Sequence, residues 1–485
     1  MSAAAAPSGG RPSAVVIGGG LAGTTAALAL ADSGADVTLL EGRPRLGGLA
    51  FSFERQSAAG PLTVDNGQHV YLRCCSAYQY FLDRVGGLDL APLQRRLDVP
   101  VLDAETMRFG RLRRAGLPVP LHLAASLARY PHLSLAERAS VGRAALALKG
   151  LDLADPDLDK EDFGSWLARH GQSPRTVEAL WDLVGVATLN AVAGESSLSL
   201  AAMVFKTGLL SEPGAADIGV ARVPLGELHD TLARRELDKA GVRTLLRTRA
   251  KSVVRGDDGR WQVTAATGPR SGETLDADAV VIAVPQREAH DLLPDGAVEN
   301  KGRLLEMGTA PILNIHVVYD RKLVRRPFFA ALGSRVQWVF DRTDTSGLAG
   351  SADGQGGQYL ALSQSAAQED IDRPVEELRK LYLPELERLL PASRDAVVRD
   401  FFVTRERTAT FAPAPGVVRL RPPSRTRARG LALAGAWTDT GWPATMESAV
   451  LSGMSAARGI LGDLGRRLTP QTRTRPLPVT ATEAA

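Results

Sequence analysis

Ala14-Val15-Val16-Ile17-Gly18-Gly19-Gly20-Leu21-Ala22-Gly23 opens the folded part of this chain and decides its fold. A short β-branched run leads into three glycines and then an alanine-rich segment, which is the order of a strand, a tight turn and a helix. Gly18 permits the turn, Gly20 lets the backbone approach a pyrophosphate, and Gly23 lets the helix pack on the strand. The N–H groups at the helix start face the anion. The stretch therefore predicts a dinucleotide-binding site.

The residues around this turn supply the rest of a dinucleotide-binding unit. Val15–Ile17 is apolar, as a buried parallel strand should be, and the helix expected over Thr24–Ser33 ends at Gly34. A second apolar strand, Val37–Leu40, leads to Glu41, roughly 20 residues after the glycines. A carboxylate at that position accepts hydrogen bonds from ribose hydroxyls, so Glu41 is expected to hold the adenosine end of the ligand.

Length and composition indicate a soluble globular protein of two or three domains. The chain has 485 residues, of which 44% are hydrophobic and 23% are charged. Its only cysteines, Cys74 and Cys75, are adjacent, so no disulfide framework is expected and a reducing cytoplasm fits. We expect neither a signal peptide nor a membrane span, and we expect disordered tails over residues 1–12 and 466–485.

Three later segments carry signals of the same kind as the first turn. Gly47-Gly48 follows the second strand, and Asp65-Asn66-Gly67-Gln68-His69 follows a predicted strand over Leu62–Val64. Near the end, Gly435 to Gly453 again reads as a turn and a helix start. A nicotinamide dinucleotide rarely needs such a second site, whereas a flavin does, because its ribityl chain and pyrimidine ring also need donors. We therefore predict a flavin dinucleotide.

Residues 94 to 215 change character and are interpreted as a helical insertion. Ser134 and Glu137 form a capping box that opens a helix to Lys149, and Ser173-Pro174 starts another. Between residues 94 and 150 there are ten basic and four acidic side chains, a net charge of +6. Leucines lie between the basic residues, so the segment suits an anionic membrane surface or, equally, a solvated basic face over core leucines. Nucleic acid is not an expected partner, since no recognised binding motif appears.

The α/β pattern then returns. Helices are expected over Ser76–Val85, with Ser76 as its cap, Pro224–Ala240, Thr445–Leu464 and Pro374–Leu390, which Pro384 should kink or split. Strands are expected over Val242–Leu246, Lys251–Val254, Trp261–Ala266, Ala279–Ala283 and Leu431–Ala434, and a second sheet over Ile312–Tyr319, Val336–Phe340, Tyr359–Ser363 and Val397–Thr404. The predicted fold class is α/β: a Rossmann-like, glutathione-reductase-type FAD-binding domain over residues 13–93, 216–290 and 425–465, with an inserted α+β substrate domain over 94–215 and 291–424.

These segments together resemble the flavin amine oxidase and phytoene desaturase superfamily, over most of residues 14–464. Within it the resemblance is closest to the hydroxysqualene dehydroxylase family. The stretches that carry it are Asp65–His69, Trp181–Asn190, Ala216–Gly219 with Arg222–Gly226, and Trp437–Glu447, of which the last two are the most distinctive. The resemblance implies FAD as the cofactor and no metal ion.

The predicted cofactor contacts follow from the glycine turns and from the resemblance. They are Gly18, Gly20, Leu21, Ala22, Gly23, Glu41, Gly42, Arg43, Gly47, Gly48, Leu49, Asn66, Gly67, Gln68, His69, Ala250, Gly435, Ala436, Pro443, Ala444, Thr445 and Met446. Two positions depart from the superfamily pattern: Leu49 stands where arginine is common, and Ala436 stands where aspartate is common. Each loss is expected to cost about 1–3 kcal/mol of charge-assisted hydrogen bonding.

The resemblance implies reduction of hydroxysqualene to squalene, with loss of water and hydride delivery from reduced flavin. Hydroxide is a poor leaving group, so an acid should protonate it, and a dry apolar cavity should protect the resulting cation. The acid candidates are His69, Asp217, Asp439 and Glu447. Each also has a structural reading: His69 orders its turn, Asp217 caps a helix or pairs with Arg222, Asp439 caps a loop, and Glu447 serves a helix dipole.

A thirty-carbon substrate places the enzyme at a membrane. The expected partners are therefore a long isoprenoid, the inner face of the cell membrane as a peripheral contact for a cytoplasmic protein, and other enzymes of the squalene route. NADPH is the reductant to test, although no second nucleotide fingerprint is present. The alternative activity is desaturation or oxidation of another polyprenyl or carotenoid chain, which runs hydride transfer the other way.

Overall fold

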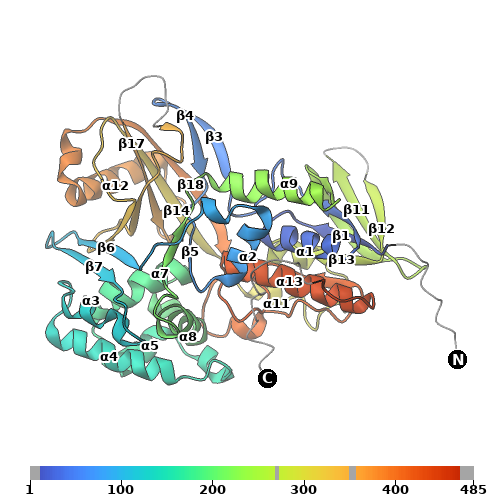
Figure 1. Cartoon of the computed structure of the whole chain (residues 1–485), viewed down its shortest axis with the longest axis horizontal. Coiled ribbons are helices and arrows are strands. Elements are labelled where there is room, and N and C mark those ends of the chain that lie inside the picture. The colour runs from blue at the N-terminus through green and yellow to red at the C-terminus, as the bar shows by residue number, and fades with distance from the viewer. Residues whose placement is uncertain (1–10, 268–271, 349–356, 470–485) are drawn as a thin grey trace.

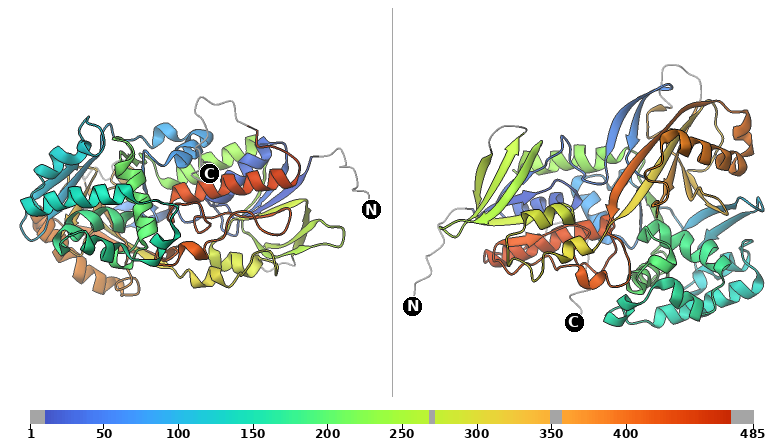
Figure 2. Two further views of the ribbon diagram at one scale, coloured as in Figure 1. Left: turned by 90° about the horizontal axis from the view of Figure 1, so that it is seen from below. Right: turned by 180° about the vertical axis from the view of Figure 1, so that it is seen from behind.

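The computed structural model describes residues 11–267, 272–348 and 357–469. The two predicted tails lie mostly outside these ranges. Two sheets lie toward opposite ends of the molecule, and a group of helices packs beside the second sheet (Figure 1). Two further views show the same separation and place the last long helix beside the first (Figure 2).

The glycine turn belongs to a parallel five-stranded sheet with the order β19-β13-β1-β2-β9. Its strands are β1 (Ser13–Ile17), β2 (Asp36–Leu40), β9 (Arg243–Leu245), β13 (Ala279–Ile282) and β19 (Leu431–Leu433). One face packs on α1 (Leu21–Asp32), α9 (Leu232–Lys239) and α13 (Met446–Asp463), and α2 (Ser76–Val85) packs on α9 and α13. The other face packs on an antiparallel meander of β10 (Thr248–Arg255), β11 (Trp261–Thr267) and β12 (Glu273–Ala277).

The strand sequences explain this three-layer arrangement. Because side chains alternate along a strand, Val16 joins the helical side whereas Val15 and Ile17 join the meander side. Both faces of the sheet are covered, so its strands are continuous apolar runs, as the sequence predicted. The Rossmann-like fold class is confirmed.

The second sheet has seven strands in the order β18-β14-β17-β16-β15-β6-β7. They are β6 (Asp98–Asp103), β7 (Phe109–Arg113), β14 (Ala310–Tyr319), β15 (Phe328–Leu332), β16 (Trp338–Asp341), β17 (Gln358–Gln364) and β18 (Val398–Thr410). Segment 94–215 is therefore not only helical, because its first part adds the hairpin β6–β7 through a parallel pairing with β15. The signal missed was the alternation in β7, where buried Gly110 and Leu112 lie between exposed neighbours.

The rest of segment 94–215 forms helices. They are α3 (Ala124–Ala128), α4 (Leu135–Gly150), α5 (Phe163–Arg169), α6 (Pro174–Thr176), α7 (Leu183–Leu189) and α8 (Leu198–Phe205). The predicted capping box of Ser134 and Glu137 opens α4. The remaining elements are β3 (Ser52–Ser57), β4 (Gly60–Asp65), β5 (Val70–Leu72), β8 (Ile218–Val220), α10 (Gln286–Leu292), α11 (Arg303–Glu306) and α12 (Val375–Leu389).

Pro384 was expected to kink or split its helix. The helix α12 is not split there, because the buried side chains of Leu378, Tyr382 and Leu386 hold it against the second sheet on both sides of the proline. Ser76 does not cap α2: the N-cap position is Cys75, and no side chain of that segment bonds to the helix start. A residue far along the chain performs this capping, as described below.

Candidate functional site

The first glycine turn has the geometry that a close approach of ligand to backbone requires. Gly18 has a φ of +109°, and a Cβ there would lie 2.3 Å from the carbonyl oxygen of Ala283 on the neighbouring strand. A Cβ at Gly23 would lie 1.8 Å from the carbonyl oxygen of Gly18, so only glycine lets α1 sit on the turn. No side chain caps α1, which leaves the N–H groups of its first turn, at Leu21 and Ala22, for an anion.

The second glycine pair lies directly against the first turn. Gly47 donates its N–H to the carbonyl oxygen of Gly19 at 2.9 Å, and a Cβ at Gly48 would lie 2.9 Å from the Cα of Gly20. Leu49 follows with 44% of its surface exposed. Two backbone turns from separate segments therefore form one glycine-lined cradle.

Glu41 stands at the end of β2 beside this cradle. Its carboxylate accepts the N–H of Gly19 at 2.7 Å and the N–H of Arg43 at 2.7 Å. Each oxygen keeps a second lone pair, so a ribose hydroxyl can still donate to it. Gly42 is exposed. Thr248 on β10 donates its N–H to the carbonyl oxygen of Glu41, which brings this strand to the cradle. Ala250, two residues further along β10, is buried.

The turn after β4 joins the cradle to the second sheet. Asn66 accepts the N–H of Phe51 and donates from Nδ2 to the carbonyl oxygen of Leu49 at 2.9 Å. The Nδ1 atom of His69 lies 3.2 Å from the carbonyl oxygen of Gly67, and burial lowers the pKa of His69. The Nε2 atom of Gln68 is buried and has no hydrogen-bond partner among the described residues.

Polar residues of the second sheet meet this turn from the other side, and sequence reasoning missed them. Asn314 on β14 and Thr404 on β18 both donate to the carbonyl oxygen of Asn66, at 3.0 and 2.9 Å. Glu406, also on β18, accepts from Asn66 Nδ2 at 2.9 Å. In sequence, Thr404 and Glu406 share a strand face by their spacing of two, but only the register of the sheet shows what that face meets.

The C-terminal segment returns to the first helix. A Cβ at Gly453 on α13 would lie 2.2 Å from the carbonyl oxygen of Ala22, so α13 and α1 cross in close contact. Thr445 caps α13 through the N–H of Ser448. The other predicted contacts of this segment precede α13 or begin it. Gly435 has a φ of +145°, and Met446 is the first residue of α13. Between them lie Ala436, Pro443 and Ala444.

Two acid candidates are structural. The buried carboxylate of Asp217 bonds Arg73 and Arg114 rather than Arg222 or a helix terminus. Burial would raise the pKa of Asp217, but the hydrogen bonds from the two guanidinium groups outweigh it and lower that pKa. Glu447 is buried and accepts the N–H groups of Ala77 and Tyr78, so it caps α2 and not its own helix. Burial raises the pKa of Glu447 to about 7.

The other two candidates differ in exposure. Asp439 is exposed and accepts the N–H of Gly441 at 3.3 Å, which is the loop-capping role expected as an alternative. His69 lies in the turn that joins the cradle to the second sheet, but its lowered pKa keeps it neutral near pH 7. Of the four candidates, only His69 belongs to that turn.

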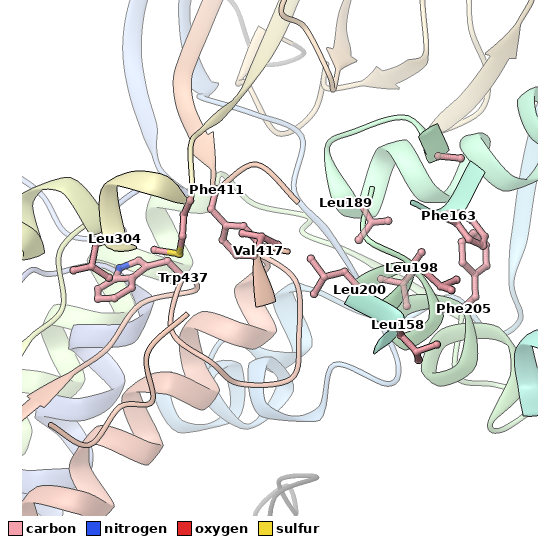
Figure 3. Packing of buried hydrophobic residues seen from close by; sticks show 14 of the residues in the cluster. Leu158, Phe163, Leu189, Leu198, Leu200, Phe205, Leu304, Phe411, Val417 and Trp437 are labelled. Atoms are coloured by element: carbon pink, nitrogen blue, oxygen red, sulfur yellow. The ribbon is translucent and has the colours of Figure 1, made fainter. Parts of the chain in front are cut away.

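These residues fit a flavin dinucleotide. The glycines of the cradle allow two backbone turns to meet without side chains, the N–H groups at the start of α1 have no side-chain cap, and the buried Gln68 Nε2 still needs an acceptor. Figure 3 draws part of the largest apolar cluster, with Leu304, Trp437, Phe411 and Val417 on one side of the view and Leu198, Leu200 and Phe205 toward the other.

Comparison with known proteins gives the family. The sequence profile described as flavin containing amine oxidoreductase matches residues 21–461. The chain belongs to this family. It is an FAD-dependent oxidoreductase, as the cradle and the sequence resemblance predicted. Within the described residues, no helix is both long and apolar enough to cross a membrane.

Curated relatives cover nearly the whole chain. A hydroxysqualene dehydroxylase of Rhodopseudomonas palustris is 29% identical over 92% of this chain and 97% of the relative, and one of Zymomonas mobilis is 26% identical over 91% and 97%. A 15-cis-phytoene desaturase of Synechococcus elongatus is 24% identical over 97% and 99%. The resemblance to the hydroxysqualene dehydroxylase family is confirmed at the level of similarity.

Solved structures of the same fold extend the comparison. A putrescine oxidase matches with a TM-score of 0.68 and 19% identity, covering 93% of this chain and 99% of that one. A putative protoporphyrinogen oxidase from Exiguobacterium matches with a TM-score of 0.64 and 18% identity, covering 94% and 99%. At this identity the likeness concerns the fold, and it supports the mixed α/β class.

Proposed function

We propose that this oxidoreductase reduces hydroxysqualene to squalene. The observation that carries the proposal is the full-length similarity to three hydroxysqualene dehydroxylases, at 26–29% identity. In this chain the turn Asn66–His69, called the cofactor turn below, is hydrogen-bonded to the second sheet. The overall change replaces a C–OH bond by C–H: one proton and one hydride enter, and water leaves. Reduced FAD supplies the hydride; the protein supplies the site, the proton and the exclusion of water.

The residues of this chain suit these tasks. The cradle of Gly18–Gly20 and Gly47-Gly48 would hold the dinucleotide by its backbone, and the Asn66 turn would position the end of the ligand nearest the second sheet. The apolar cluster around Trp437 and Phe411 would keep water from a carbocation. We also propose the domain division of the sequence analysis, with residues 94–215 and 291–424 as the substrate domain.

We further propose that one end of the molecule rests on an anionic membrane. In the helix α4, Leu135 is 80% exposed and Leu146 is 59% exposed, and its exposed charges, Arg143 and Lys149, are basic. From Thr106 to Leu151 the only acidic residue is Glu137, whose carboxylate is engaged in the capping box. Tyr130 and Leu133 lie among the basic residues in the sequence, but both are core residues and do not belong to this surface.

The experiment is a direct conversion. The purified yellow protein is incubated with hydroxysqualene under anaerobic conditions with NADPH or dithionite, and the lipid extract is analysed by mass spectrometry. Squalene as the product supports the proposal, and unchanged hydroxysqualene with either reductant contradicts it. The alternative, a desaturase, is favoured by the similarity to phytoene desaturases and predicts instead that phytoene gains double bonds under oxidising conditions.

A further inference from the structure

Glu406 is a carboxyl group at the junction of the cofactor turn and the second sheet. Two residues of β18 that share a face hold Asn66 from two sides: Thr404 bonds its carbonyl oxygen, and Glu406 Oε1 accepts from its Nδ2. The same Nδ2 also donates to the carbonyl oxygen of Leu49, which directly follows the Gly47-Gly48 pair. One amide group therefore connects Glu406 to the cradle.

The surroundings of Glu406 anchor one of its carboxyl oxygens and favour its protonated form over that of an exposed carboxyl group. The side chain is partly buried, and burial raises its pKa against the opposing effects of Asn66, Arg45 and Arg43, which are the charged and polar groups that face it. Its second oxygen, Oε2, accepts no hydrogen bond from a described residue. A carboxyl group with one oxygen anchored and one free is oriented and can donate its proton.

The other buried acids near the predicted cofactor segments accept hydrogen bonds at both carboxylate oxygens, and Asp439 is exposed to solvent. Asp65 bonds Ser52, the N–H of Leu225 and Arg342, and both carboxylate oxygens of Glu41 accept backbone N–H groups. Asp217 and Glu447 are structural, as shown above. Glu406 is the carboxyl group at this junction whose bonding leaves a chemical role open.

We propose that Glu406 donates the proton that turns the leaving hydroxyl into water, with Asn66 as its positioning residue. This inference rests on the proposed dehydroxylation. The O–H bond of Glu406 breaks, the proton forms a bond to the substrate hydroxyl, and the C–O bond breaks with its electron pair leaving on water. The carbon then gains a hydride from the reduced cofactor. Glu406 is left as a carboxylate, which nearby Arg45 stabilises until solvent returns the proton.

The test compares Glu406→Gln with Asp372→Asn. The first change keeps the shape and an oxygen that can accept from Asn66 but removes the acidic proton. The control removes a carboxylate that bonds Arg407 on the same strand, where both side chains are exposed. For each variant we would measure the flavin content, the reduction rate of the bound flavin without substrate, and kcat for squalene formation from pH 5 to 9.

We expect Glu406→Gln to keep its flavin and its reduction rate but to lose about 10²–10⁴-fold in kcat. In the wild type, kcat should fall at alkaline pH as Glu406 ionises, and the residual activity of Glu406→Gln should lack this fall. The variant Glu406→Asp, which keeps an acidic proton, should have a higher kcat than Glu406→Gln. Asp372→Asn should match the wild type. A Glu406→Gln enzyme within threefold of wild-type kcat, with the wild-type pH profile, would overturn the assignment. If the wild type forms no squalene at all, the proposed function itself is refuted, and the role of Glu406 falls with it.

Discussion

Replacing Asp217 by asparagine should destabilise the protein and leave its chemistry intact. The side chain is fully buried and accepts five hydrogen bonds: from the N–H of Leu97, from Nε and Nη2 of Arg73, and from Nε and Nη2 of Arg114. Its partners Arg73, Leu97 and Arg114 precede Asp217 by 144, 120 and 103 positions in the chain. The carboxylate therefore fastens the start of segment 94–215 to the β5–β8 pair.

The expected loss follows from the exposure of the partners. Breaking a buried ion pair by removing one charge costs about 3–5 kcal/mol, because the remaining charge is left without compensation. The side chain of Arg114 is only 15% exposed and would bear this cost, whereas that of Arg73 is 44% exposed and can be rehydrated. We therefore expect Asp217→Asn to lower the free energy of unfolding by roughly 3 kcal/mol, near the lower end of that range.

Urea unfolding followed by tryptophan fluorescence measures this loss, with flavin content and kcat recorded at low urea. Arg222→Gln is the control, since the sequence alone allowed Arg222 as the partner; it should change the unfolding free energy by less than about 0.5 kcal/mol. The lowered pKa of Asp217 means that its stabilisation is present above the unfolded-state value and is lost as the pH falls through the folded-state value. Unchanged unfolding with a large loss of kcat would refute this reasoning and return Asp217 to the acid candidates.

Three further outcomes are expected. Gly23→Ala should yield protein without yellow flavin absorbance because its Cβ would meet the carbonyl oxygen of Gly18, whereas Gly142→Ala, in open space on α4, should bind flavin normally. Burial raises the pKa of Glu447 from 4.5 to about 7, so the stability that this residue confers is complete below pH 4.5 and is lost as the pH rises through 7. Thermal melts should show the free energy of unfolding fall by about 3 kcal/mol in all over this range. The variant Glu447→Gln should show no such fall. Leu135→Glu with Leu146→Glu should weaken co-sedimentation with phosphatidylglycerol vesicles at least about tenfold, whereas Val397→Glu, at a residue that is 60% exposed, should not.

The parts of the fold that sequence predicted are those whose physical requirements are local. The turn at Gly18 needs a positive φ and a missing Cβ, and both needs are visible within ten residues. The strands of the parallel sheet are apolar because helices and meander cover both faces. The sequence could not show that α12 stays unsplit at Pro384, because the residues that keep it whole act through its packing on the second sheet.

The candidate site divides in the same way. The glycine cradle could be predicted, and its two turns do meet, but the roles of Asp217, Glu447 and Glu406 could not. Glu447 caps a helix 370 residues away, and Glu406 meets Asn66 across 340 residues. A carboxyl group's chemistry depends on which donors surround it, and here those donors come from distant segments.

At both departures from the superfamily pattern, Leu49 and Ala436, an arginine elsewhere in the chain bonds the backbone beside the changed residue. At the first, Leu49 removes a cation, but Arg45 lies over the ring of Phe51 and donates to the carbonyl oxygen of Gly48 at 3.2 Å, so a guanidinium still stands at the second glycine turn.

At the second departure, Ala436 removes an anion, and the buried Arg421 donates to the carbonyl oxygens of Ala436, Trp437 and Thr438. Burial lowers the pKa of Arg421 to about 10, which leaves it charged at neutral pH. Its bonds to these carbonyl groups use Nε and Nη2, while Nη1 of Arg421 is buried and has no hydrogen-bond partner among the described residues. The guanidinium fixes the backbone of the segment Ala436–Thr438, so we infer that the missing carboxylate costs less than its lost hydrogen bonds alone would suggest.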